Sequence, residues 1–131
     1  MSLASVKKDI ESACKDCGRT PGDVALIAVT KNHGIDDISL LIGQGHRTFG
    51  ENRIQEACEK WPALRSNHSD LQLHFIGHLQ TNKARDAVKI FDALHTIDSD
   101  RLADAVKNEM EKQGRNLPCF IQVNTGEETQ K

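Results

Sequence analysis

Short apolar segments recur along this chain at a nearly constant interval, and an amphipathic stretch follows each of the first four. The five segments have the composition of buried strands and start 22, 25, 22 and 26 residues apart, spanning 24–30, 46–50, 71–76, 93–97 and 119–123. Between them, apolar residues recur at helical spacing. Alternating strands and helices at this pitch predict a parallel sheet with right-handed crossovers, either a doubly wound open sheet or a (β/α) barrel.

The amphipathic stretches are bounded by residues that start and end helices. A further helix is predicted over residues 2–17, where Gly18 can terminate it. Side chains that cap helix starts, and glycines that follow helix ends, stand at the expected places: Asn52 with Gln55, Asn82, Ser99, Gly43 and Gly114.

The phosphate-binding motifs of open nucleotide-binding sheets are missing. No G-x-G-x-x-G follows the first strand and no G-x-x-x-x-G-K-[ST] occurs, which favours an α/β barrel of the TIM type. Such a barrel has eight strand and helix units and about 250 residues, whereas this chain of 131 residues supplies five units. We therefore expect residues 1–131 to form a single partial barrel domain, a fragment that lacks about three units.

The charge and hydropathy of the chain limit the kinds of molecule that it is expected to bind. Seventeen basic and nineteen acidic residues give a net charge of -2, and the mean hydropathy is -0.52. These values predict neither a nucleic-acid surface nor a membrane span, and favour a small-molecule ligand. Without a recognisable leader at Met1, the chain is expected in the cytoplasm.

Four cysteines are too scattered for a metal site. Cys14 and Cys17 form a lone C-x-x-C, while Cys58 and Cys119 stand alone, so zinc ligation is not predicted. We expect reduced thiols, with Cys14 and Cys17 packing on one helix face.

Lys31 closes the first apolar segment and is followed at once by Asn32, His33 and Gly34. In parallel α/β proteins, reactive groups lie where strands end. An amine that loses solvation there is more often neutral, which suits Schiff-base chemistry. The alternative is a loop lysine that only solvates the strand end.

Four segments in this order resemble a known family: residues 28–31, 49–52 with 55–56, 74–83 and 121–126. The chain resembles the YggS/PROSC family of pyridoxal phosphate homeostasis proteins, which share the barrel of the alanine racemase N-terminal domain. The match runs from the first predicted helix to the last residue, and residues 74–83 are its most specific part.

The resemblance implies a cofactor site for pyridoxal 5'-phosphate (PLP) at the carboxyl ends of the strands. Lys31 takes the place of the lysine that forms the internal aldimine. Asn52 is expected to orient the cofactor ring or its phenolic oxygen, or else to be a plain helix cap. His74 is a further candidate or a satisfied core histidine. At Gly77 the missing side chain allows close approach of the cofactor or of neighbouring backbone, and Asn124 faces the same opening.

The family's phosphate-binding loops and the arginine at the ring nitrogen have no counterpart in this sequence. We therefore expect this chain alone to hold PLP weakly. An open barrel also exposes apolar faces and two unpaired edges, which predicts self-association.

Three functions compete. The favoured one is a carrier that holds PLP as a lysine aldimine and releases it to PLP-dependent enzymes, without turnover. A PLP-dependent amino-acid racemase is the second, but racemases with this barrel take their second base, a tyrosine, from an added β domain, and this chain has no tyrosine. The third is a cofactor-free α/β scaffold in which Lys31 is only a surface charge.

Overall fold

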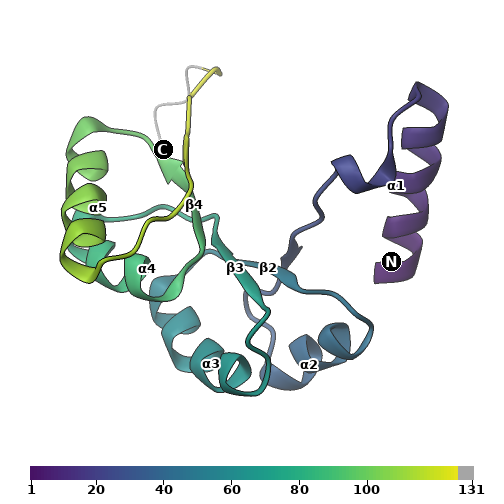
Figure 1. Ribbon diagram of the computed structural model, residues 1–131, viewed down its shortest axis with the longest axis horizontal. Coiled ribbons are helices and arrows are strands. Elements are labelled where there is room, and N and C mark those ends of the chain that lie inside the picture. The colour runs from purple at the N-terminus through teal and green to yellow at the C-terminus, as the bar shows by residue number, and fades with distance from the viewer. Residues whose placement is uncertain (127–131) are drawn as a thin grey trace.

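The computed structural model describes residues 1–126 and contains one parallel sheet, whose connecting helices lie on one side, while the N-terminal helix lies apart from them (Figure 1). The helices are α1 (Leu3–Cys17), α2 (Ile35–Gly43), α3 (Ile54–Asn67), α4 (Ala84–Ile90) and α5 (Asp100–Gln113), with short 3-10 helices η1 (Pro21–Asp23) and η2 (Thr81–Lys83). The strands are β1 (Ala28–Val29), β2 (Thr48–Glu51), β3 (Gln72–Phe75), β4 (Ala93–Ile97) and β5 (Cys119–Ile121).

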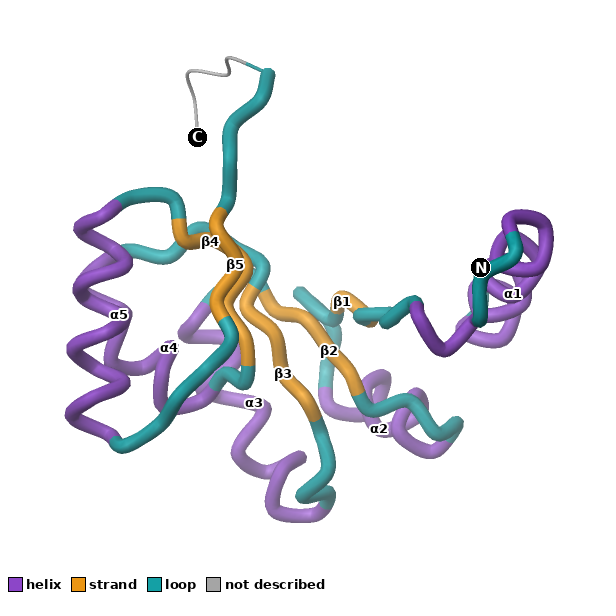
Figure 2. Tube along the Cα trace, turned by 45° about the horizontal axis from the view of Figure 1, so that its top comes forward, coloured by secondary structure: helices purple, strands orange, loops and turns teal. Residues whose placement is uncertain are grey.

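The strands lie in sequence order, β1-β2-β3-β4-β5, and every neighbouring pair is parallel. Helices α2 to α5 follow one another along the outer side of the curved sheet (Figure 2). A doubly wound sheet would reverse its strand order and place helices on both faces. Crossovers of one hand in one direction instead wind a barrel, so this is the architecture of five of a barrel's eight units.

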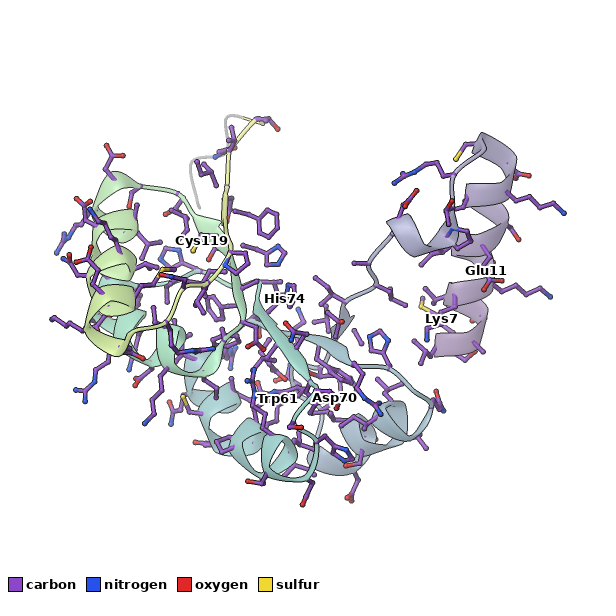
Figure 3. The ribbon with its side chains drawn as sticks, viewed as in Figure 1. Lys7, Glu11, Trp61, Asp70, His74 and Cys119 are labelled. Carbon is purple, nitrogen blue, oxygen red and sulfur yellow. The ribbon has the colours of Figure 1, made fainter. Side chains whose placement is uncertain are left out.

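The hydrophobic core fills the space between the outer face of the sheet and its helices. Trp61 of α3 is fully buried there (Figure 3) and its ring lies 5.3 Å from that of Phe49 on β2. Phe75 of β3 meets Phe91, which follows α4, with ring centroids 5.0 Å apart. Alternation along each strand sends every second side chain to this core and the others to the inner face.

Most predicted elements are present, with shifts at their ends. The predicted strand 24–30 is reduced to Ala28–Val29, because only these two residues pair with β2. The strand predicted over 93–97 has the same bounds in the structure. The N-terminal helix starts at Leu3, and Ser2 caps it.

The capping predictions are confirmed in part. Ser99 accepts a hydrogen bond from the Leu102 amide at the start of α5, and Gly18 and Gly114 end α1 and α5 in the left-handed conformation. The predictions for Asn52 and Asn82 are wrong. Helix α3 begins after Arg53 and α4 after Lys83, and neither start has a side-chain cap.

All four cysteines are free thiols. The predicted packing is right for Cys14, which is buried, and wrong for Cys17, which is exposed at the last turn of α1.

Candidate functional site

Parallel pairing brings the ends of the strands to one edge of the sheet. Val29 of β1 is in register with Gly50 of β2, and Gly50 with His74 of β3. The segments that follow these strands therefore lie together, and they carry Lys31, Asn52 and Gly77. This is the edge at which (β/α) barrels place their functional groups.

Lys31 lies in a tight turn directly after β1. The His33 amide donates to the Thr30 carbonyl oxygen at 3.0 Å, which closes the turn. Asn32 has φ 64°, the left-handed value that the third position of a type II turn requires and that asparagine tolerates better than most residues. Lys31 is exposed. The expected desolvation of its amine is therefore wrong.

A buried ammonium group forms hydrogen bonds with the backbone of this turn. Lys60 of α3 is 8% exposed, and its Nζ donates to the carbonyl oxygens of Thr30 and His33, both at 2.9 Å. It also lies 2.8 Å from Oε2 of Glu56 and 2.9 Å from Oε2 of Glu51. A buried charge needs such partners, since an unpaired one would cost several kcal/mol.

Glu51, at the end of β2, is the second centre of this cluster. Its side chain is fully buried, and Oε2 accepts from the Thr30 hydroxyl at 2.6 Å and from the Trp61 indole N–H at 3.0 Å. Its Oε1 has no hydrogen-bond partner among the described residues. We call Glu51, Glu56, Lys60 and Trp61 the turn-anchoring cluster.

Asn52 and Gly77 meet at the ends of β2 and β3. The Asn52 side-chain oxygen is buried and has no hydrogen-bond partner in the described part of the chain. A Cβ added to Gly77 would lie 2.1 Å from the Asn52 carbonyl oxygen. Of the two expectations for Gly77, close approach of neighbouring backbone is therefore the one that the structure confirms.

His74 lies within β3, and its ring is half-buried on the inner face. Its Nδ1 is 2.8 Å from Nε2 of His95 on β4, and the His95 ring stacks on Phe120 of β5 at 4.6 Å. Burial lowers the pKa of both imidazoles, and for His74 the neighbouring His95 lowers it further. His74 thus has a histidine partner that the sequence did not predict.

Asn124 lies beyond β5 at the same edge of the sheet and is exposed. Its side-chain oxygen accepts from the Gly126 amide at 3.3 Å. Its part in a cofactor site stays a prediction.

Sequence reasoning missed the turn-anchoring cluster and His95. One signal was present: Glu56 and Lys60 stand four residues apart, the spacing of an ion pair on a helix. Another was Glu51, a carboxylate at the end of the short strand β2. Nothing in the sequence pattern pairs residues 74 and 95, because that contact depends on the register of β3 and β4.

A parallel sheet whose strands lie in sequence order defines a (β/α)-barrel protein, a class of protein in which functional groups lie at the carboxyl ends of the strands. The family model described as "Alanine racemase, N-terminal domain" matches residues 2–128. This chain belongs to that family, and the barrel fold predicted from the sequence is confirmed.

Curated relatives carry the name pyridoxal phosphate homeostasis protein. The one from Escherichia coli is 37% identical over 131 residues, which is 99% of this chain and 56% of the relative. The one from Synechocystis sp. is 51% identical over 87 residues, which is 66% of this chain and 38% of the relative. The resemblance stated from the sequence is confirmed, and the chain spans about half the length of the curated relatives that it matches.

Solved structures of other proteins are similar to this chain in fold and in sequence. PipY of Synechococcus elongatus, solved with PLP bound, has a TM-score of 0.79 and 39% identity, over 91% of this chain and 56% of that chain. A protein from Bifidobacterium adolescentis, described as unknown, has a TM-score of 0.90 and 29% identity, over 98% of this chain and 55% of that one.

Two features are absent from residues 1–126. None of these residues belongs to a helix long and apolar enough to cross a membrane. Nor do they include a group of three or more His, Cys, Asp or Glu side chains placed to hold a metal ion.

Proposed function

We propose that this chain binds PLP and takes part in PLP homeostasis, with Lys31 as the amine that bonds to the cofactor's aldehyde. The observation that supports this most is PipY, which was solved with PLP bound and is 39% identical to this chain over 91% of its length. The names of the curated relatives point to the same role.

The residues at the strand ends fit such a cofactor. Lys31 offers an exposed primary amine in a turn whose backbone is held in place. Asn52, on the adjoining strand end, has a buried side-chain oxygen without a hydrogen-bond partner in residues 1–126. An unpaired buried acceptor is unfavourable, and a bound ligand with a hydroxyl or N–H group would satisfy it.

PLP supplies an aldehyde, and condensation with an amine forms a C=N bond, breaks the C=O bond and releases one water molecule. Three residues of this chain have proposed roles in binding and orienting the cofactor. Lys31 provides the amine, Asn52 orients the ligand by a hydrogen bond, and Gly77 allows the two strand ends to approach. We also propose His74 and Asn124 as further cofactor contacts, since both belong to strands that reach this edge.

A spectroscopic titration tests this proposal. Wild-type chain mixed with PLP should show the absorbance change of a lysine adduct, and Lys31→Ala should lose most of it. Lys107→Ala is the matched control, because it removes an exposed lysine of α5. If Lys31→Ala binds as well as Lys107→Ala, the assigned site is wrong.

The wider role is part of the same proposal. We place the chain in the cytoplasm, supported by its four free thiols, which suit a reducing compartment. We propose PLP-dependent enzymes as the recipients of the cofactor. We also propose self-association through β5, an edge strand on which Phe120 is 53% and Ile121 79% exposed.

A further inference from the structure

Lys31 stands on a turn that the sheet itself does little to hold. Strand β1 is at the edge of the sheet, and only Ala28 and Val29 pair with β2. Beyond them, one ladder-like hydrogen bond runs from the Thr30 amide to the Gly50 carbonyl oxygen. The turn also contains Asn32 in the left-handed conformation, which side chains rarely adopt. Some other interaction must therefore fix the backbone on either side of Lys31.

Two residues of the turn-anchoring cluster form hydrogen bonds with the two peptide groups that flank Lys31. On the N-terminal side, the ammonium of Lys60 donates to the Thr30 carbonyl oxygen, which belongs to the peptide joining Thr30 to Lys31. On the C-terminal side, Oε2 of Glu56 accepts from the Asn32 amide at 2.7 Å, which belongs to the peptide joining Lys31 to Asn32. Lys60 and Glu56 also bond to each other at 2.8 Å. The two contacts together determine the direction in which the Lys31 side chain leaves the backbone.

We propose that Glu56 and Lys60 are positioning residues for Lys31, and that they accelerate its reaction with an aldehyde by holding its backbone in one orientation. This inference rests on the proposed function. Neither residue touches the reacting atoms. A fixed backbone leaves only the lysine's side-chain torsions to search, and restricted geometry of this kind raises the rate of a reaction between two bound groups.

The two positioning residues differ in how well they can be tested. Lys60→Met leaves the buried carboxylate of Glu51 unpaired, so that variant can fail to fold. Glu56 is partly exposed, and its pKa is lowered chiefly by the hydrogen bond from Lys60. Glu56→Ala removes the acceptor of the Asn32 amide, whereas Glu56→Gln keeps an oxygen there. Glu59→Ala is the matched control, because Glu59 is an exposed carboxylate of the same helix that contacts Gln55.

The experiment measures the rate at which each variant of the 131-residue chain reacts with PLP. Borohydride, added at timed intervals, reduces the C=N bond to a stable amine, and peptide mapping gives the amount at Lys31 and at exposed Lys107. We expect Glu56→Ala to slow labelling of Lys31 about tenfold, and Glu56→Gln and Glu59→Ala to stay close to wild type. Labelling of Lys107 should be the same in all four proteins. Amide exchange at Asn32 should speed up in Glu56→Ala only.

The outcomes separate the two proposals. If wild type labels Lys31 and Glu56→Ala labels it equally fast, the positioning role is wrong and the PLP site stands. If Glu56→Gln is as slow as Glu56→Ala, charge and not hydrogen bonding sets the rate, and the inference is overturned. If wild type shows no preference for Lys31 over Lys107, both proposals fail together.

Discussion

At the residue scale, Gly77 fixes the distance between two strand ends. The backbone after β3 passes so close to Asn52 that a methyl group would overlap its carbonyl oxygen, carbon and Cα. The Asn52 atoms that an added Cβ would meet belong to the backbone, which cannot rotate away as a long side chain can. Gly77 is therefore required for the geometry of the edge where Lys31 and Asn52 lie.

Gly77→Ala is expected to lower the free energy of unfolding by about 3 kcal/mol, since an overpacked site must shift backbone. Urea unfolding followed by circular dichroism measures it. Gly22→Ala is the control, because its added Cβ meets nothing within 4 Å, and it should stay within about 0.5 kcal/mol of wild type. Equal midpoints for the two variants would contradict the close approach.

Individual residues also explain why only part of the candidate site could be predicted from the sequence. Lys31, Asn52 and Gly77 follow strands, so their common edge was predictable from parallel topology. Nothing in the sequence pattern distinguishes Lys60 from a solvated surface lysine. In the structure it is buried, and four oxygen atoms surround its ammonium group and compensate for the lost water. Convergence of this kind depends on how α3 docks against β2, which a linear pattern does not contain.

At the element scale, helix starts give a direct comparison. Ser99→Ala should cost about 1 kcal/mol, because the Leu102 amide loses its cap. Asn82→Ala should be near neutral, since α4 starts without a side-chain cap. Thermal unfolding of both variants measures the difference, and an equal loss in the two would show that Asn82 does cap its helix.

The histidine pair between β3 and β4 makes stability depend on pH. Burial lowers the pKa of His74 and His95 from 6.5, so the unfolded chain takes up their protons at a higher pH than the folded chain does. Their contribution is complete above about pH 6.5 and is lost as the pH falls. The urea midpoint should drop between about pH 7 and pH 5.5, and His95→Gln should drop less. His78→Gln, at an exposed position, is the control, and a drop in His95→Gln equal to wild type would contradict the account.

Element order and type were predictable because apolar periodicity is strong in each unit, and β4, paired on both sides, kept its predicted bounds. The first strand was overestimated because apolar residues 24–27 have no partner strand within the described sheet. Apolar character predicts burial, whereas a strand also needs a ladder of backbone hydrogen bonds.

At the scale of the whole molecule, the described sheet has two edges, β1 and β5. β5 is exposed along its length, and it carries the apolar side chains of Phe120 and Ile121. We expect concentration-dependent association in sedimentation velocity, and Ile121→Glu should weaken it. Leu40→Glu, which changes an exposed apolar residue of α2, should not. If both variants associate like wild type, β5 is not the contact.

The account depends most on one amine at the strand-end edge of this sheet. The most direct test is to treat the wild-type chain with PLP and borohydride and to identify the modified residue by mass spectrometry. We predict that Lys31 carries most of the reduced adduct, well ahead of every other exposed lysine. A label spread evenly over the surface lysines, with Lys31 unremarkable among them, would contradict the proposed site.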